Sequence, residues 1–121
     1  MKGPSHRTEQ VAETIRQVLA AALLREEVRD PRVRSTVLIT AVRVTNDLSV
    51  ARVLVAVPGE EADRTRTLEG LQSAAGFLRG RIARTLSTRT VPELRFELDR
   101  GAEHAARIDT LLSDLRREGR D

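Results

Sequence analysis

The chain has 121 residues, of which 40% are hydrophobic, 32% are charged and only 2% are aromatic. This length and balance fit one globular domain with an aliphatic core. The absence of cysteine excludes disulfide bonds, thiolate zinc sites and cysteine nucleophiles. The net charge is +3, and Lys2 is the only lysine among 21 basic residues. A biased genome composition is a sufficient cause of this preference for arginine, although guanidinium groups also match the geometry of phosphates.

The N-terminal residues contain no apolar run, so the sequence predicts a flexible N-terminus over residues 1–6 rather than a signal peptide. No stretch approaches the roughly 20 apolar residues that cross a bilayer. We therefore expect a cytoplasmic protein that does not associate with membranes.

The first predicted element is a long amphipathic helix that begins at a Thr8 N-cap. It should end before Asp30-Pro31, because proline disfavours helical geometry in the residue before it. Its apolar side chains recur at helical spacing: Val11, Ile15, Val18, Leu19, Ala22 and Leu23.

Two β-branched runs, residues 37–45 and 49–57, flank a turn at Asn46-Asp47 and predict a hairpin. Four residues of the first strand share one predicted face: Leu38, Thr40, Val42 and Val44. Arg43 and Arg52 lie on the opposite face, so we expect that face of the sheet to be exposed.

A second helical region follows the hairpin and is divided by small residues near its middle. A strand after Val91-Pro92, a C-terminal helix over 108–115 and a polar tail over 116–121 complete the pattern. The long helical connection allows the third strand to run parallel to a strand of the hairpin. The sequence thus predicts one α+β domain over residues 7–115, with the order α-β-β-α-kink-α-β plus a C-terminal helix. It should be a two-layer fold with a three-stranded mixed sheet.

The sequence offers no constellation of residues for catalysis or metal binding. His6 and His104 lie in different segments without spaced acidic or histidine partners. No glycine-flanked nucleophile and no phosphate-binding glycine loop occurs. We therefore expect a protein that is not an enzyme and needs no metal or other cofactor.

Two basic clusters supply the candidate binding residues. The first contains no acid: Arg79, Arg81, Arg84 and Arg89. The second surrounds Asp30-Pro31: Arg29, Arg32 and Arg34. Both can run along RNA phosphates, although a solvated helix face explains a run of arginines equally well. Phe77 and Phe96 fall on predicted core positions, which favours recognition of RNA backbone and shape over base stacking.

The small residues Ala74, Ala75 and Gly76 have two interpretations. Gly76 is either an ordinary helix C-cap or part of a sharp kink that lets an RNA backbone approach closely. The residues alone slightly favour the C-cap.

Several segments together resemble the ribosome-binding factor A family, in family order over about residues 7–112. They are Val11-Ala12-Glu13 with Ile15 and Leu19; Asp30-Pro31-Arg32; Ile39 to Val44 with Asp47-Leu48-Ser49 and Ala51-Arg52-Val53; Ser73 to Arg79; Val91-Pro92-Glu93-Leu94 with Phe96 and Asp99; and Arg107-Ile108 with Leu111-Leu112. The stretches Ala74 to Arg79 and Val91 to Leu94 are specific in combination.

The resemblance implies a type II KH-like fold in which Ala74, Ala75 and Gly76 form the interhelical kink, where ordinary KH domains carry a glycine-rich backbone clamp. It implies binding to the immature 30S ribosomal subunit during late maturation and processing of 16S rRNA. It also implies a role in cold adaptation, and action without nucleotide or metal. The chain departs from the family pattern at Leu54 and Ala106, away from the basic clusters.

The leading hypothesis is a monomeric ribosome assembly factor whose partners are the 30S subunit and its 16S rRNA. One alternative is a protein–protein adaptor that acts through Arg43, Arg52, Arg95 and Glu97 on the exposed sheet face. The other is a general nucleic-acid binder. Binding that survives ribonuclease would favour the adaptor, and equal affinity for duplex DNA and ribosomal RNA would favour the general binder.

Overall fold

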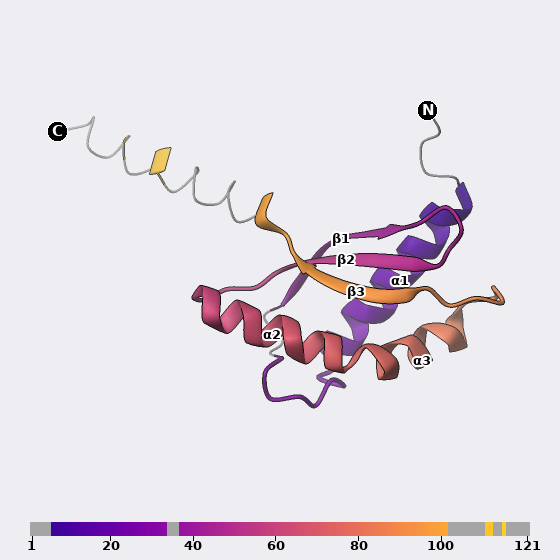
Figure 1. Cartoon of the computed structure of the whole chain (residues 1–121), viewed down its shortest axis with the longest axis horizontal. Helices are drawn as coiled ribbons and strands as arrows, with labels where there is room; N and C mark the ends of the chain where they lie inside the picture. The colour runs from indigo at the N-terminus through magenta and orange to yellow at the C-terminus, as the bar shows by residue number, and fades with distance from the viewer. Residues whose placement is uncertain (1–5, 34–36, 102–110, 113–114, 116–121) are drawn as a thin grey trace.

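The computed structural model describes residues 6–33, 37–101, 111–112 and 115. Its elements, in chain order, are α1 (His6–Leu24), β1 (Leu38–Val44), β2 (Val50–Ala56), α2 (Glu61–Ser73), α3 (Ala75–Thr85) and β3 (Glu93–Leu98). This order confirms the predicted α+β fold from the first helix to the third strand (Figure 1). The predicted C-terminal helix, the tail at 116–121, residues 1–5 and Arg34 lie wholly or largely outside the described residues.

The sheet is mixed and has the strand order β1-β2-β3. β1 and β2 form the predicted antiparallel hairpin, while β2 and β3 run parallel. The α2–α3 pair is the crossover that parallel strands require. α1 packs on β1 and α3, and both α2 and α3 pack on β3, so the helices cover one face and leave the other open (Figure 1).

The core lies between the sheet and the helices and is aliphatic, as the composition predicts. Its largest fully buried side chains are Ile15, Leu19, Val53, Val55, Leu71, Leu78, Ile82, Pro92 and Leu94. Within the described part of the chain, no helix is both long and apolar enough to span a bilayer.

The prediction that Leu38 lies on the inward face of β1 is wrong. The pairing shifts between Ile39, opposite Val55, and Ala41, opposite Leu54. Such a bulge inserts one extra residue and reverses the alternation of side chains. Leu38 is therefore 63% exposed, whereas Ile39 packs against the core.

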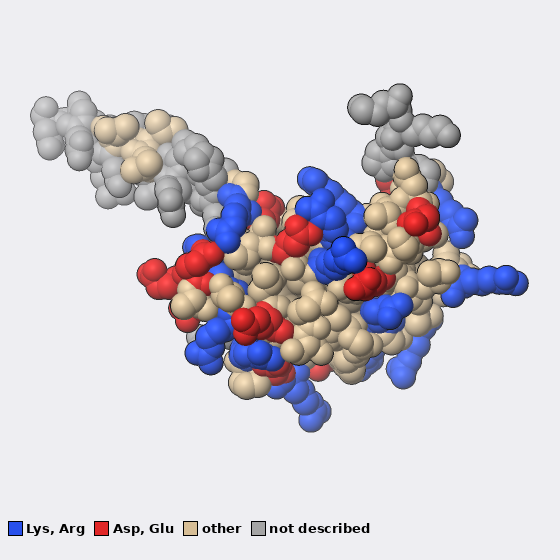
Figure 2. All heavy atoms as spheres, in the orientation of Figure 1, with Lys and Arg blue, Asp and Glu red and all other residues tan. Residues whose placement is uncertain are grey.

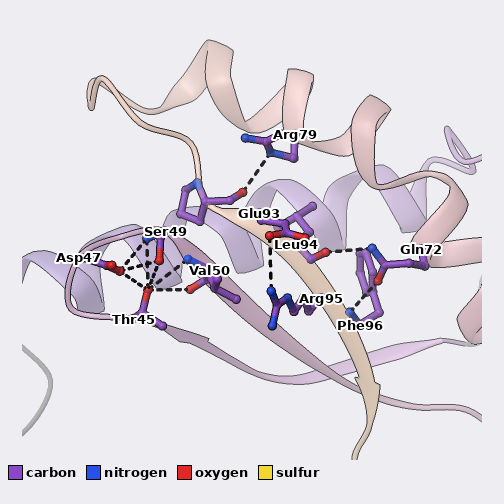
Figure 3. A network of polar contacts seen from close by, with 11 residues as sticks. Thr45, Asp47, Ser49, Val50, Gln72, Arg79, Glu93, Leu94, Arg95 and Phe96 are labelled. Carbon is purple, nitrogen blue, oxygen red and sulfur yellow. Dashed lines mark hydrogen bonds and ion pairs between the residues drawn. The ribbon is translucent and has the colours of Figure 1, made fainter.

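The hairpin turn is held by side chains as well as by backbone. The Asp47 carboxylate accepts hydrogen bonds from the hydroxyls of Thr45 and Ser49, both at 2.7 Å, and from the Ser49 N–H at 3.1 Å (Figure 3). These donors, those of Ser49 first, lower the pKa of Asp47 from 3.8 to about 2. The tight turn places Leu48 at φ 61°, a left-handed conformation that is uncommon for leucine.

Both predicted ends of the first helix need correction. The helix begins at His6, so Thr8 is a buried residue of its first turn rather than an N-cap. It ends at Leu24, before the position that Pro31 indicated.

The earlier C-terminal end of α1 has a local cause. The N–H groups of Glu26 and Glu27 donate to the carbonyls of Leu23 and Ala22, at 3.1 and 2.9 Å, and Glu26 has φ 55°. This is the hydrogen-bond pattern of a Schellman motif, which usually places glycine at the left-handed position. Because Glu26 occupies that position, the sequence carried no sign of the helix end.

Candidate RNA-binding surface

The break between α2 and α3 lies at Ala74. This residue has φ −85° and ψ −1°, and its N–H donates to the carbonyls of Gly70 and Leu71. Ala75 and Gly76 are already the first two residues of α3. Gly59 is the glycine with positive φ in the described part of the chain. Gly76 is therefore not a left-handed C-cap, and its lack of a side chain has another reason.

The outward face of α3 is made of small residues and one arginine. Gly76, Gly80 and Arg84 are spaced four apart, Ala83 adjoins them, and all four are exposed. A Cβ built on Gly76 or Gly80 would meet nothing within 4 Å. No residue that the structure describes thus requires glycine at these two positions, and both cost helix stability relative to alanine. We call Gly76, Gly80, Ala83 and Arg84 the α3 face.

The predicted arginine Arg79 donates hydrogen bonds to the backbone of the protein itself. Figure 3 shows that Arg79 leaves α3 on the side of β3. Its guanidinium donates to the backbone carbonyls of Val91 at 2.9 Å and Pro92 at 3.2 Å. These bonds hold the start of β3 against the helix. A second side chain, Gln72, accepts a hydrogen bond from the Phe96 N–H and donates one to the Leu94 carbonyl (Figure 3). Gln72 thus satisfies backbone groups of β3 along the edge that does not pair with β2.

Arg32 organises the loop that connects α1 to β1. It forms a double hydrogen bond with the Asp30 carboxylate, at 2.9 and 2.6 Å, and also donates to the Ser73 hydroxyl at 3.2 Å. The Arg32 side chain and then its N–H hold the pKa of Asp30 at about 2. Like Arg79, Arg32 stabilises the fold through hydrogen bonds within the protein.

The same loop packs closely on α2 at Gly70. A Cβ at Gly70 would lie 2.8 Å from Cγ2 of Val33 and 3.0 Å from Cβ of Arg32. The Thr67 hydroxyl also donates to the Arg32 carbonyl at 3.0 Å. Gly70, which sequence reasoning passed over, is thus the glycine of this helix pair that the fold itself requires.

Arg81 is paired at the other side of α3. Its guanidinium forms an ion pair with Glu27 at 2.8 Å and lies over the Phe77 ring, 5.2 Å from the ring centre. The expectation that both phenylalanines are buried is wrong for Phe77, which is 46% exposed, and correct for Phe96, which is 7% exposed. Phe77 precedes Leu78 of the buried stripe and so projects about 100° away from it on the helix.

Three of the predicted arginines are available to a ligand. Arg29, Arg84 and Arg89 are exposed and make no ion pair or side-chain hydrogen bond with any residue that the structure describes. Arg29 lies in the loop beside the α2–α3 break, Arg84 in the last turn of α3, and Arg89 in the loop that follows. Figure 2 shows basic side chains projecting where α3 and this loop lie, whereas acidic ones gather at the start of α2.

The open face of the sheet carries opposite charges in alternation (Figure 2). Arg43, Arg52 and Arg95 are in register across the three strands. Glu97 accepts two hydrogen bonds from Arg52, at 2.6 and 2.9 Å, which raises the pKa of Arg52 and lowers that of Glu97. Arg95 also pairs with Glu93 at 3.6 Å, so two of these three arginines are offset by glutamates. Arg29, Arg84 and Arg89 have no such partner among the described residues.

The described residues contain no group of three or more His, Asp or Glu side chains that could hold a metal ion. Of the arginines that the sequence singled out, Arg29, Arg84 and Arg89 remain as one candidate surface, in which Arg29 lies beside the start of α3 and Arg89 follows its end. The α3 face lies between them. Arg32, Arg79 and Arg81 bond within the protein, and Arg34 lies outside the described residues.

Comparison with known proteins matches residues 7–112 to the ribosome-binding factor A family. A curated relative from Caldanaerobacter subterraneus, described as ribosome-binding factor A, is 37% identical over 121 residues, all of this chain and 98% of its own. Among solved structures, a putative ribosome binding factor A from Thermotoga maritima is 33% identical, with a TM-score of 0.68 over 80% of this chain and 91% of its own. Ribosome binding factor A from Thermus thermophilus, fitted into a cryo-EM map of a complex with the 30S subunit, is 28% identical, with a TM-score of 0.58 over 81% and 97%. The fold is therefore KH-like, as the resemblance implied, and the chain belongs to the ribosome-binding factor A family.

Proposed function

We propose that this protein is a non-enzymatic ribosome assembly factor of the cytoplasm that binds the immature 30S subunit. The observation that carries the proposal is the α3 face with its flanking cations. An acid-free helix presents two glycines that the fold does not need, and Arg29, Arg84 and Arg89 project around them. The Thermus thermophilus relative in a 30S complex supports the choice of partner.

The physical role of each part follows from this arrangement. Gly76 and Gly80 leave the α3 backbone uncovered, so a ribose-phosphate chain can approach it closely. The unpaired guanidiniums supply charge-assisted hydrogen bonds to phosphates. Because this recognition reads backbone and shape, it suits a structured region of 16S rRNA.

Binding is tested by co-sedimentation with immature small subunits. Arg84→Glu with Arg89→Glu should abolish association while the urea denaturation curve stays that of a folded protein. The matched control is Arg43→Glu with Arg66→Glu, which changes the net charge equally at two exposed, unpaired arginines outside this surface. Unchanged binding of the first variant, or equal loss in the control, contradicts the proposed surface.

We propose further that binding assists late maturation and processing of 16S rRNA, including at low temperature. The support is membership of the ribosome-binding factor A family. Expression in a bacterium that lacks its own family member should restore growth in the cold and reduce precursor 16S rRNA. The Arg84→Glu, Arg89→Glu variant should fail in both respects.

A further inference from the structure

A concave surface lies where the loop after α1 meets the α2–α3 break. It has a volume of about 640 Å³, and its wall includes Ala74, Phe77 and Arg81 from the helix pair and Arg25 and Arg29 from the loop. It adjoins the α3 face, because Phe77 of its wall directly follows Gly76 in α3.

Phe77 is the unusual member of this wall. The chain has two phenylalanines, no tyrosine and no tryptophan, yet one of these few aromatic rings is 46% exposed. The Arg81 guanidinium lies 5.2 Å from its ring centre and is itself held by Glu27 at 2.8 Å. The ring and the guanidinium are thus fixed against each other as a flat, partly apolar surface.

The polar groups around this surface are mixed in sign. Arg25 and Arg29 are exposed cations without a partner among the described residues, whereas Glu26, Glu27 and Asp30 supply carboxylates to the same wall. A site for phosphate alone would not include three carboxylates. The edge of a nucleobase presents both donors and acceptors, and RNA proteins commonly stack unpaired bases on aromatic rings and guanidinium planes.

We propose that Phe77 and Arg81 stack an unpaired nucleobase of the bound RNA, while Arg25 and Arg29 contact its neighbouring phosphates. This inference rests on the proposed RNA-binding function and adds a base-binding subsite to it. It adds base stacking to the recognition of RNA backbone and shape that the sequence favoured.

The test compares substitutions at Phe77 for affinity to immature small subunits. Phe77→Leu keeps an apolar side chain but removes the aromatic face, and it should weaken binding roughly 5- to 150-fold, the usual effect of losing one stacked base. Phe77→Trp should retain or strengthen binding, since a larger ring still stacks. A structural role would instead make both changes harmful. The control Leu24→Ala, at a leucine that is 81% exposed at the end of α1, should bind like the wild type.

A photoreactive phenylalanine analogue at position 77 identifies what occupies the site. Crosslinks should join it to ribosomal RNA on the small subunit. Crosslinks only to a ribosomal protein, or wild-type affinity of Phe77→Leu, would overturn the base-binding subsite. If the Arg84→Glu, Arg89→Glu variant still loses binding in those cases, the proposed function stands and only the subsite fails.

Discussion

Replacing both glycines of the α3 face with alanine should make the protein more stable and its binding weaker. Gly76 and Gly80 have helical backbone, and an added Cβ meets nothing within 4 Å. Each Gly→Ala change should then raise the free energy of unfolding by about 0.5–1 kcal/mol, since alanine loses less backbone entropy. Gly76 is in the first turn and should contribute the smaller share.

The assay is urea denaturation of Gly76→Ala, Gly80→Ala and the double variant, followed by co-sedimentation with small subunits. The double variant should gain about 1–2 kcal/mol in total, and its affinity should fall because two methyl groups separate the RNA backbone from the helix. Gly70→Ala is the contrasting control. Its Cβ would lie 2.8 Å from Val33, so it should lose about 1–3 kcal/mol through overpacking.

Two results would refute this reasoning. A lower free energy of unfolding in the double variant would mean that α3 needs its glycines for its own geometry. Greater stability with unchanged affinity would mean that RNA does not approach the α3 backbone.

Three further predictions concern the residues that build the surface. Arg79→Met should lower the free energy of unfolding by about 1–2 kcal/mol, because it removes the two bonds to Val91 and Pro92; an unchanged urea midpoint would contradict this role. Glu26→Gly should raise the thermal midpoint, with a gain of about 1 kcal/mol, because glycine adopts φ 55° without strain; a loss would show that the glutamate side chain is needed. Asp47 has a pKa of about 2 in the folded protein against 3.8 when unperturbed, so its stabilisation is complete above pH 4 and is lost as the pH falls toward 2. Urea titrations from pH 5 to pH 2 should therefore give a shallower pH dependence for Asp47→Asn, and identical slopes would count against the hydrogen-bonded turn.

Periodicity predicted most of the fold because the pattern and the packing agree. The apolar stripe of α1 and, apart from Leu38, the apolar residues of the predicted inward face of the hairpin pack in the core as expected. The length of the helical connection indicated that β3 could run parallel to a strand of the hairpin, and the structure shows that this strand is β2. These features depend on local spacing, which a sequence displays directly.

The errors arose where backbone details override the pattern. The β1 bulge exposes Leu38, and the left-handed Glu26 ends α1 without a glycine or proline. Neither the bulge nor the left-handed turn contains a residue type from which the sequence could have predicted it. Gly70 was passed over because its neighbours, Arg32 and Val33, come from a distant part of the chain.

The sequence predicted the candidate site only in part, because contacts between distant segments decide which arginines remain exposed. The acid-free run correctly located a basic helix. Composition alone could not distinguish Arg79, which donates hydrogen bonds to the backbone just before β3, from Arg84, which faces solvent. The position of Phe77 next to Leu78, rather than four residues from it, was a usable signal that its ring lies off the buried stripe.

The central claim, that Arg29, Arg84 and Arg89 contact phosphates of the small subunit, is tested most directly by the salt dependence of binding. Affinities of the wild type and of the triple arginine-to-glutamine variant are measured over a range of KCl concentrations. Each lost phosphate contact lowers the slope of log affinity against log salt by about 0.7–0.9, so the triple variant should show a slope smaller by about two to three. Equal slopes for the two proteins would contradict the claim.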